Sequence, residues 1–86
     1  MTNKTPEQRS YVARVSWVSP EGRYAMTNVV GIGRVTFSFA PGENVWAEGD
    51  APIKGAKVVL SNLVMMDGGW RALKARYYRP EDQASK

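Results

Sequence analysis

The stretch YVARVSWVSPEGRYAMTNV, residues 11–29, holds two short runs rich in β-branched and aromatic residues on either side of the segment SPEG. Such runs are typical of β-strands, and Pro followed two positions later by Gly is typical of a tight turn. The stretch therefore predicts a β-hairpin. It also places Trp17, Tyr24 and Met26 around one turn, where they either belong to the core or form a surface that binds a flat ligand.

Glycine and proline divide the rest of the chain into further short runs of the same kind, and helix signals are poor. The segment DGG near the C-terminal end is a strong hairpin signal. A long loop is expected over 40–55. Five short strands with little helix predict a closed, antiparallel, all-β barrel, because closure removes the free edges of an open sheet. The strands are expected over 11–18, 23–29, 34–39, 56–66 and 70–78.

Alternation along the expected strands separates an inner from an outer face. It assigns Val35 and Phe37 to the core and places Val58 and Leu60 on a shared face. In the last strand, alternation groups Arg71, Leu73, Ala75 and Tyr77 on one side and Trp70, Ala72, Lys74 and Arg76 on the other. The second group gives that strand a basic side.

With 86 residues the chain has room for one domain. We expect that domain over 10–79, between a flexible, polar N-terminal arm over 1–9 and a flexible, polar tail over 80–86. The net charge is +4, and arginine outnumbers lysine, which favours polyanionic partners because arginine stacks on flat rings and forks onto phosphate.

The composition also excludes several classes of site. Without cysteine or histidine there is no disulfide framework, no metal site built on these residues and no histidine-based triad. The eight carboxylates show no paired spacing for acid–base or metal chemistry. We therefore expect no enzyme, no metal and no cofactor. The chain carries no apolar run of membrane length and no secretory signal, so the expected location is the cytoplasm and no membrane partner is expected.

The segment ARVSWVSPEGRYAMT resembles the opening of the bacterial cold-shock domain family. Val15 and Trp17 align with that family's Val and Trp, while Tyr24 and Met26 align with the two Phe positions of its first ribonucleoprotein motif. The later segments VTFSF, KGAKVVL and GGWRALKARYYRP follow the family pattern in order. The resemblance implies a five-stranded OB-fold barrel that binds single-stranded RNA or DNA. An SH3-like barrel with a different strand order is the alternative.

The chain departs from the family pattern at several positions. Ser16 and Gly22 stand where the family has lysines, and Thr36 and Ser38 stand where it has a stacking Phe and a His. Val18 replaces a further Phe. These departures favour a rival function, a protein-interaction module that docks on a transcription or translation complex. The net positive charge and the retained aromatic residues Trp17 and Tyr24 favour nucleic-acid binding.

For Trp17, strict alternation predicts a place beside Val15 in the core, whereas the resemblance implies the surface. Trp46 either contacts a base or plugs one end of the barrel. The leading hypothesis is binding of single-stranded nucleic acid with low sequence preference, in an RNA-chaperone or gene-regulatory role. The candidate binding residues are Trp17, Arg23, Tyr24, Met26, Arg34, Ser38, Phe39, Trp46, Arg71 and Lys74.

Overall fold

Five strands and one short helix make up residues 10–84, the part of the chain that this computed structural model describes. Each strand begins and ends within one residue of the range that the sequence predicts, which confirms the expected all-β organisation. The expected N-terminal arm over 1–9 lies outside the described residues. The elements are β1 (Ser10–Val18), β2 (Tyr24–Val29), β3 (Gly33–Ser38), β4 (Lys57–Met66), β5 (Gly69–Tyr77) and α1 (Pro80–Ala84).

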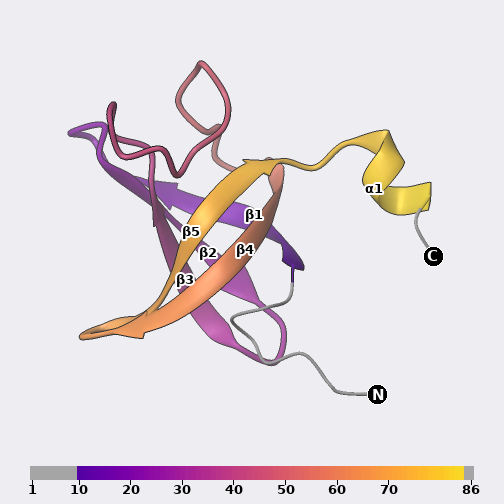
Figure 1. Cartoon of the computed structure of the whole chain (residues 1–86), viewed down its shortest axis with the longest axis horizontal. Coiled ribbons are helices and arrows are strands. Elements are labelled where there is room, and N and C mark those ends of the chain that lie inside the picture. Colours follow the sequence, from indigo (N-terminus) through magenta and orange to yellow (C-terminus); the bar gives the residue numbers. More distant parts are fainter. Residues whose placement is uncertain (1–9, 85–86) are drawn as a thin grey trace.

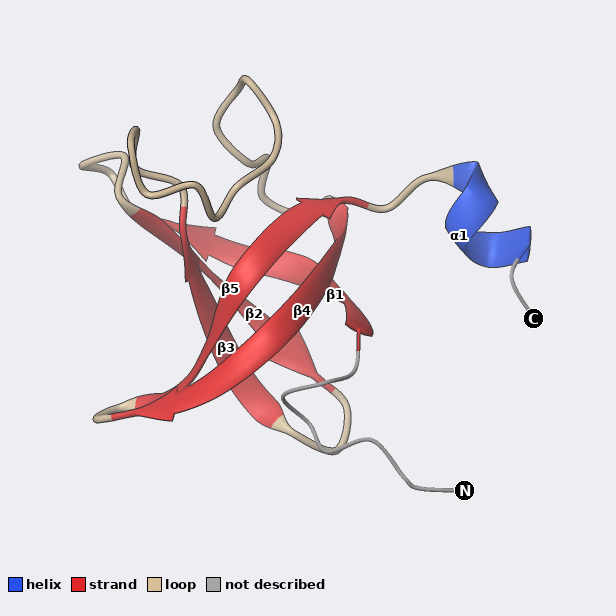
Figure 2. Ribbon diagram, viewed as in Figure 1, coloured by secondary structure: helices blue, strands red, loops and turns tan. Residues whose placement is uncertain are grey.

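The strands close into a barrel in the order β1-β2-β3-β5-β4, with β1 also paired to β4 (Figures 1 and 2). Four of the five pairings are antiparallel, but β3 and β5 run parallel, so the fully antiparallel prediction is wrong at this one seam. The reason is topological: the long 40–55 loop lets the chain cross the barrel before β4 begins. The architecture is consistent with an OB-like barrel, the first of the two barrel types considered.

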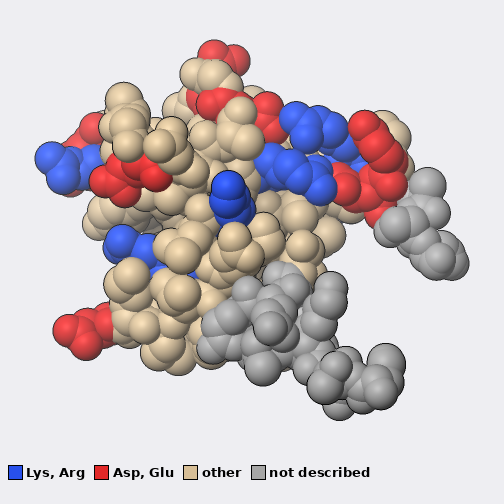
Figure 3. Space-filling view, in the orientation of Figure 1, with Lys and Arg blue, Asp and Glu red and all other residues tan. Residues whose placement is uncertain are grey.

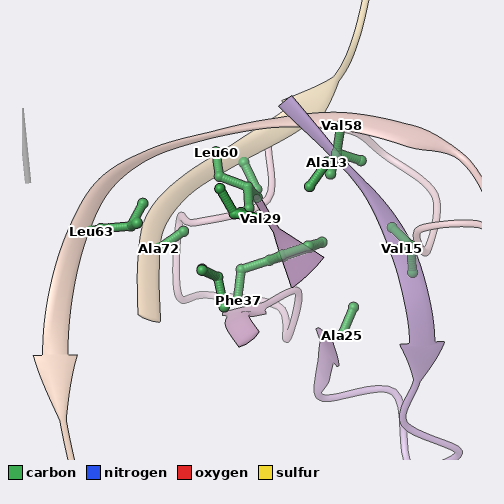
Figure 4. Close-up of a cluster of buried hydrophobic side chains, with 11 residues drawn as sticks. Ala13, Val15, Ala25, Val29, Phe37, Val58, Leu60, Leu63 and Ala72 are labelled. Carbon is green, nitrogen blue, oxygen red and sulfur yellow. The ribbon is translucent and has the colours of Figure 1, made fainter. Parts of the chain in front are cut away.

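The barrel interior is filled by apolar side chains from all five strands (Figure 4). Val35, Phe37, Val58 and Leu60 are fully buried, as alternation predicts. Thr27 is fully buried, and its hydroxyl donates a hydrogen bond to the Val35 carbonyl oxygen at 2.9 Å. Among the described residues, no buried side-chain nitrogen or oxygen lacks a hydrogen-bond partner, so β2 and β3 form a rigid support for the side chains on their outer faces.

Alternation fails in the middle of β5. Ala72 and Ala75 are both buried, while Leu73 and Lys74 between them are both exposed. The prediction that Ala75 and Leu73 share a face is therefore wrong. Across the ladder, between the partners of Lys74 and Ala72, Asn62 of β4 adopts a left-handed backbone with φ of 57°, and the alternation of β4 is interrupted there as well.

The 40–55 loop completes the barrel beside the C-terminal half of β5. The Ala75 N–H donates to the Val45 carbonyl oxygen at 3.0 Å, and the Ala47 N–H donates to the Ala75 carbonyl oxygen at 2.9 Å. The Tyr77 N–H donates to the Glu48 carboxylate at 3.0 Å. The loop therefore replaces β3 as the neighbour of β5 beyond the short parallel seam.

The helix α1 follows β5 and is tied to it by an ion pair between Arg76 and Asp82, at 2.7 Å. Arg79, which directly precedes the helix, contacts Glu48 of the 40–55 loop at 2.9 Å. Figure 3 shows basic and acidic side chains gathered at the α1 end of the molecule. The flexibility expected for 80–86 stays a prediction, although its residues 80–84 have helical backbone. Within residues 10–84, no helix has the length and apolar character needed to cross a bilayer.

Candidate nucleic-acid interface

A β-bulge in β1 decides where the first tryptophan points. Val15 pairs with Thr27, but the next pairing joins Trp17 to Met26, so Ser16 and Trp17 together oppose a single residue of β2. The Ser16 hydroxyl donates to the Met26 carbonyl oxygen at 3.1 Å and holds the bulge in place. The extra residue reverses the alternation after Val15, which is 2% exposed. Trp17 is therefore on the outer surface with 39% of its area exposed, and the prediction from strict alternation is wrong.

Tyr24 lies beside Trp17 on the same surface. Its side chain is 40% exposed, and the two ring centroids are 5.8 Å apart with an angle of 49° between the ring planes. Ala25 is fully buried, so the neighbouring outward positions of β2 go to Tyr24 and to the half-buried Met26. The first hairpin thus exposes two adjoining aromatic faces instead of sealing them in the core.

The turn before Tyr24 is held by Ser19, a residue that the sequence analysis did not single out. The Ser19 hydroxyl is buried and accepts hydrogen bonds from the backbone N–H groups of Arg23, at 2.9 Å, and Tyr24, at 3.1 Å. The Ser19 N–H donates to the Tyr24 carbonyl oxygen at 2.9 Å. Gly22 has a positive φ of 79° in this turn, a conformation suited to glycine. The signal was present in the sequence, because Ser at the first position of a turn often binds backbone amides.

The outer surface continues from the rings of β1 and β2 across two further strands, β3 and β5. Met26 pairs with Thr36, and Thr36 pairs with Arg71 across the parallel seam. Because direct partners in a ladder point to the same side, these side chains follow Trp17 in one row across the barrel. We call the surface formed by Trp17, Tyr24, Met26, Thr36 and Arg71 the outer platform.

One end of the outer platform is hollowed. The hollow measures about 230 Å³ and is lined by Arg23, Tyr24, Ser38, Ala40, Glu43 and Arg71. We call it the Arg23–Arg71 hollow. Within the described part of the chain, the ion pairs are Arg76–Asp82 and Arg79–Glu48, so neither of the two lining arginines is paired. Glu43 is likewise in no ion pair there, and this hollow is therefore lined by two cations, one anion and the exposed Tyr24 residue.

Ser38 reaches this hollow only as part of its wall. Its exposure is 9%, its hydroxyl donates to the Arg23 carbonyl oxygen at 3.3 Å, and the same hydroxyl accepts the Ala40 N–H at 3.2 Å. The Phe39 N–H donates to the Arg23 carbonyl oxygen at 2.9 Å, which ties the end of β3 to the first turn. Ser38 therefore supports the backbone under Arg23.

Trp46 packs at one end of the barrel. Its ring stacks on Phe37 with centroids 5.3 Å apart and meets the edge of Tyr77 at 5.0 Å, while its indole N–H donates to the Asp50 carbonyl oxygen at 2.6 Å. Of the two interpretations of this residue, the packing is that of a barrel plug. Phe39, half-buried against the core, lines a larger hollow of about 390 Å³ together with Trp46. These two aromatic residues are thus grouped with the loop and not with Trp17 and Tyr24.

Two of the expected cations lie away from the rings. Lys74 pairs with Ser61, which pairs with Ser10, and so belongs to the outer side of β1, β4 and β5. Arg34 is exposed and pairs with Asn28, at the far end of the β2–β3 ladder from Tyr24. The structure therefore does not bring Lys74 to the outer platform, and it places Arg34 at that surface's distant margin.

Arg14 also lies at the margin of the outer platform, near Arg34, and the sequence did not identify it as a candidate. It is exposed, pairs with Asn28 and donates to the Gly55 carbonyl oxygen at 3.0 Å. The alternation of Ala13, Arg14 and Val15 before the bulge already indicates that it points outward. The outer faces of β1, β2 and β3 thus hold two arginines, Arg14 and Arg34, one on each side of Asn28.

The strongest electrostatic coupling lies outside the outer platform. The hydrogen bond from the Arg76 guanidinium, followed by that from the Arg79 backbone N–H, lowers the pKa of Asp82 from 3.8 to about 2. The same hydrogen bond raises the pKa of Arg76 from its ordinary value. Across residues 10–84, no group of carboxylates is arranged to hold a metal ion.

Comparison of this chain with protein-family models, with curated proteins and with solved structures found no match. The surface itself offers two exposed rings, a row of outward side chains from Trp17 to Arg71, and arginines without ion pairs in the described residues.

Proposed function

We propose that this protein binds single-stranded RNA or DNA with low sequence preference on its outer platform, as a divergent relative of the cold-shock domain family. The observation that carries the proposal is the β-bulge at Ser16 and Trp17, which turns the indole outward beside Tyr24. A small barrel that needed Trp17 only for stability could bury it by keeping the alternation regular. The bulge instead leaves the Trp17 ring exposed to solvent.

Exposed rings suit unpaired bases because every base has a π-face. Stacking on an aromatic side chain contributes about 1–3 kcal/mol per base and depends little on sequence. Trp17 and Tyr24 are inclined at 49°, so they do not form a parallel slot for one base. Their arrangement suits two successive bases of a flexible strand, one on each ring, and the apolar Met26 can extend the contact.

The cations supply the second half of the interaction. Arg23 and Arg71 flank the rings without acidic partners in the described chain, so both are available to phosphate groups. Arg34 and Arg14 lie farther along the same outer surface. Contacts of this kind position a nucleic-acid backbone without reading its sequence, and they weaken as salt rises.

In the cell, such binding would serve an RNA-chaperone or gene-regulatory role in the cytoplasm. Stacking and ion pairing suffice for that role, so the proposal involves no cofactor and no catalysis. Rigid support is what the barrel contributes: the buried face of β2 and β3 fixes the strands whose outer side chains would contact bases.

A fluorescence titration tests the proposal. Replacing Trp46 and Trp70 with Phe leaves Trp17 as the sole tryptophan, so quenching by an unstructured oligouridine reports on that ring. We expect saturable quenching that reverses with added salt. The Trp17→Ala variant, followed by labelled oligonucleotide, should lose about 5- to 150-fold in affinity. Leu73→Ala is the matched control, because Leu73 is 40% exposed but lies outside the outer platform.

Absence of quenching up to high micromolar oligonucleotide, with circular dichroism showing a folded barrel, would overturn the proposal. The second candidate, a protein-interaction module of a transcription or translation complex, would then be favoured. One observation supports it: Met65 and Met66, at the tip of the β4–β5 hairpin, are 60% and 48% exposed. Methionine side chains adapt readily to the surface of a protein partner.

A further inference from the structure

The Arg23–Arg71 hollow is lined by both positive and negative side chains, whereas a surface that binds only phosphate would carry positive ones. Its walls include the two arginines and the Glu43 carboxylate, with the exposed Tyr24 ring beside them. In the described chain, Glu43 is not within ion-pair distance of either arginine. Three charged groups thus line one small space without forming ion pairs among the described residues, which suits a ligand that carries both an anion and hydrogen-bond donors.

The larger hollow beside the 40–55 loop differs in this respect. The Glu48 carboxylate there already accepts the Tyr77 N–H at 3.0 Å and pairs with Arg79 at 2.9 Å. The Asp50 carbonyl oxygen accepts the Trp46 indole N–H. The Glu48 carboxylate of that hollow is therefore engaged within the protein, whereas Glu43, Arg23 and Arg71 of the Arg23–Arg71 hollow are in no ion pair of the described residues.

We infer that the Arg23–Arg71 hollow is a nucleotide subsite that prefers guanine, with Glu43 reading the base edge and the arginines holding the adjoining phosphate. The inference rests on the proposed function and adds a base preference at one position of the bound strand. A base stacked on Tyr24 can direct its edge toward Glu43, because both residues line the same space of about 230 Å³.

The chemistry of the base edges selects guanine. A carboxylate only accepts hydrogen bonds, and its two oxygens match two adjacent donors. The Watson–Crick edge of guanine presents two such donors, N1–H and the N2 amino group. Uracil presents a single N–H between two carbonyl oxygens, which a carboxylate repels. Cytosine and adenine each present one amino donor next to a ring nitrogen acceptor.

The hollow is also built to hold its shape. Ser38 and Phe39 bind the Arg23 carbonyl oxygen at 3.3 and 2.9 Å, and the buried Ser19 hydroxyl binds the N–H groups of Arg23 and Tyr24. The backbone on which the stacking ring and one arginine stand is therefore fixed before a ligand arrives. Fixed geometry is what allows a base edge to be read.

The test compares two RNA hexamers, UUUUUU and UUUGUU, by fluorescence anisotropy. The wild-type protein should bind the guanine-containing hexamer about 5- to 10-fold more tightly, the lower part of the range for one bidentate base contact. In Glu43→Ala that ratio should fall to about 1, while affinity for UUUUUU stays equal or rises because a negative charge near phosphate is removed. Glu21→Ala, which removes an exposed carboxylate outside this hollow, should keep the wild-type ratio.

The two proposals fail in different ways. If the wild-type protein binds both hexamers equally, or if Glu43→Ala keeps the preference, the guanine subsite is overturned while strand binding stands. If neither hexamer binds, strand binding on the outer platform is overturned, and the guanine subsite with it.

Discussion

The salt dependence of oligonucleotide binding should separate the arginines that flank the rings from the remaining surface cations. Arg23 and Arg71 line one hollow beside Tyr24, and Arg34 lies on the same outer face. Lys74 is also exposed, but it pairs with Ser61 on the outer side of β4 and β5, away from the outer platform. Replacing one cation at a time with Ala therefore changes charge by the same amount at positions with different predicted roles.

The magnitude follows from counterion release. For single strands, each phosphate neutralised by a protein cation contributes about −0.7 to the slope of log affinity against log salt. Three contacting arginines give a wild-type slope of roughly −2, or about a 20-fold loss of affinity between 50 and 200 mM salt. Arg23→Ala and Arg71→Ala should each reduce the slope by about 0.7, and the double variant should lose only about 3-fold over that range.

Fluorescence anisotropy of a labelled oligouridine at five or six salt concentrations measures these slopes. Lys74→Ala should retain the wild-type slope, and all variants should unfold at nearly the wild-type midpoint because the changes are on the surface. A slope that falls as much for Lys74→Ala as for Arg71→Ala would refute the reasoning, since binding would then depend on total charge and not on this face.

Three further outcomes test individual contacts. Ser19→Ala should reduce stability by about 1–3 kcal/mol by leaving two backbone N–H groups of the first turn without their acceptor, whereas Ser19→Thr should retain most of it; equal urea midpoints for Ala and wild type would contradict this role. Thr27→Val should cost about 1 kcal/mol in urea unfolding because a buried hydrogen bond is lost, and an unchanged midpoint would count against it. The Asp82 carboxyl should titrate by NMR near pH 2 and not near 3.8. Because the folded-state pKa is lowered, the stabilising Arg76 contact should be complete above about pH 4 and lost as pH falls through 2. Arg76→Ala should raise the midpoint of the Asp82 titration, and a wild-type titration midpoint near 3.8 would disprove the coupling.

The strands were predictable because their signals are local. Turn residues such as those of SPEG and DGG mark the ends of runs rich in β-branched and aromatic residues, and each run became a strand within one residue of the expected range. Core positions such as Phe37 and Leu60 followed from alternation. The parallel seam between β3 and β5 could not be predicted in this way, because strand pairing depends on how the chain crosses the barrel.

The site was predictable only in part, since two interruptions of the alternation decide which side chains point outward. The bulge at Ser16 exposes Trp17, and the left-handed Asn62 accompanies the change of face that leaves Lys74 away from the rings. The residue type at 16 gives no sign of a bulge, whereas Asn at 62 is one of the few non-glycine residues that readily adopt a left-handed backbone. Trp46 shows a third difficulty, because its stacking on Phe37 depends on how the 40–55 loop folds back.

The measurement that tests the central claim most directly is a backbone amide and indole N–H chemical-shift map of the protein titrated with oligouridine. If unpaired bases stack on the rings that the bulge exposes, the shifts will concentrate in 16–26 and 34–39, with further shifts around Arg71, and the Trp17 indole N–H will move. Shifts confined to 56–66, with the Trp17 indole N–H unmoved at saturation, would contradict the claim.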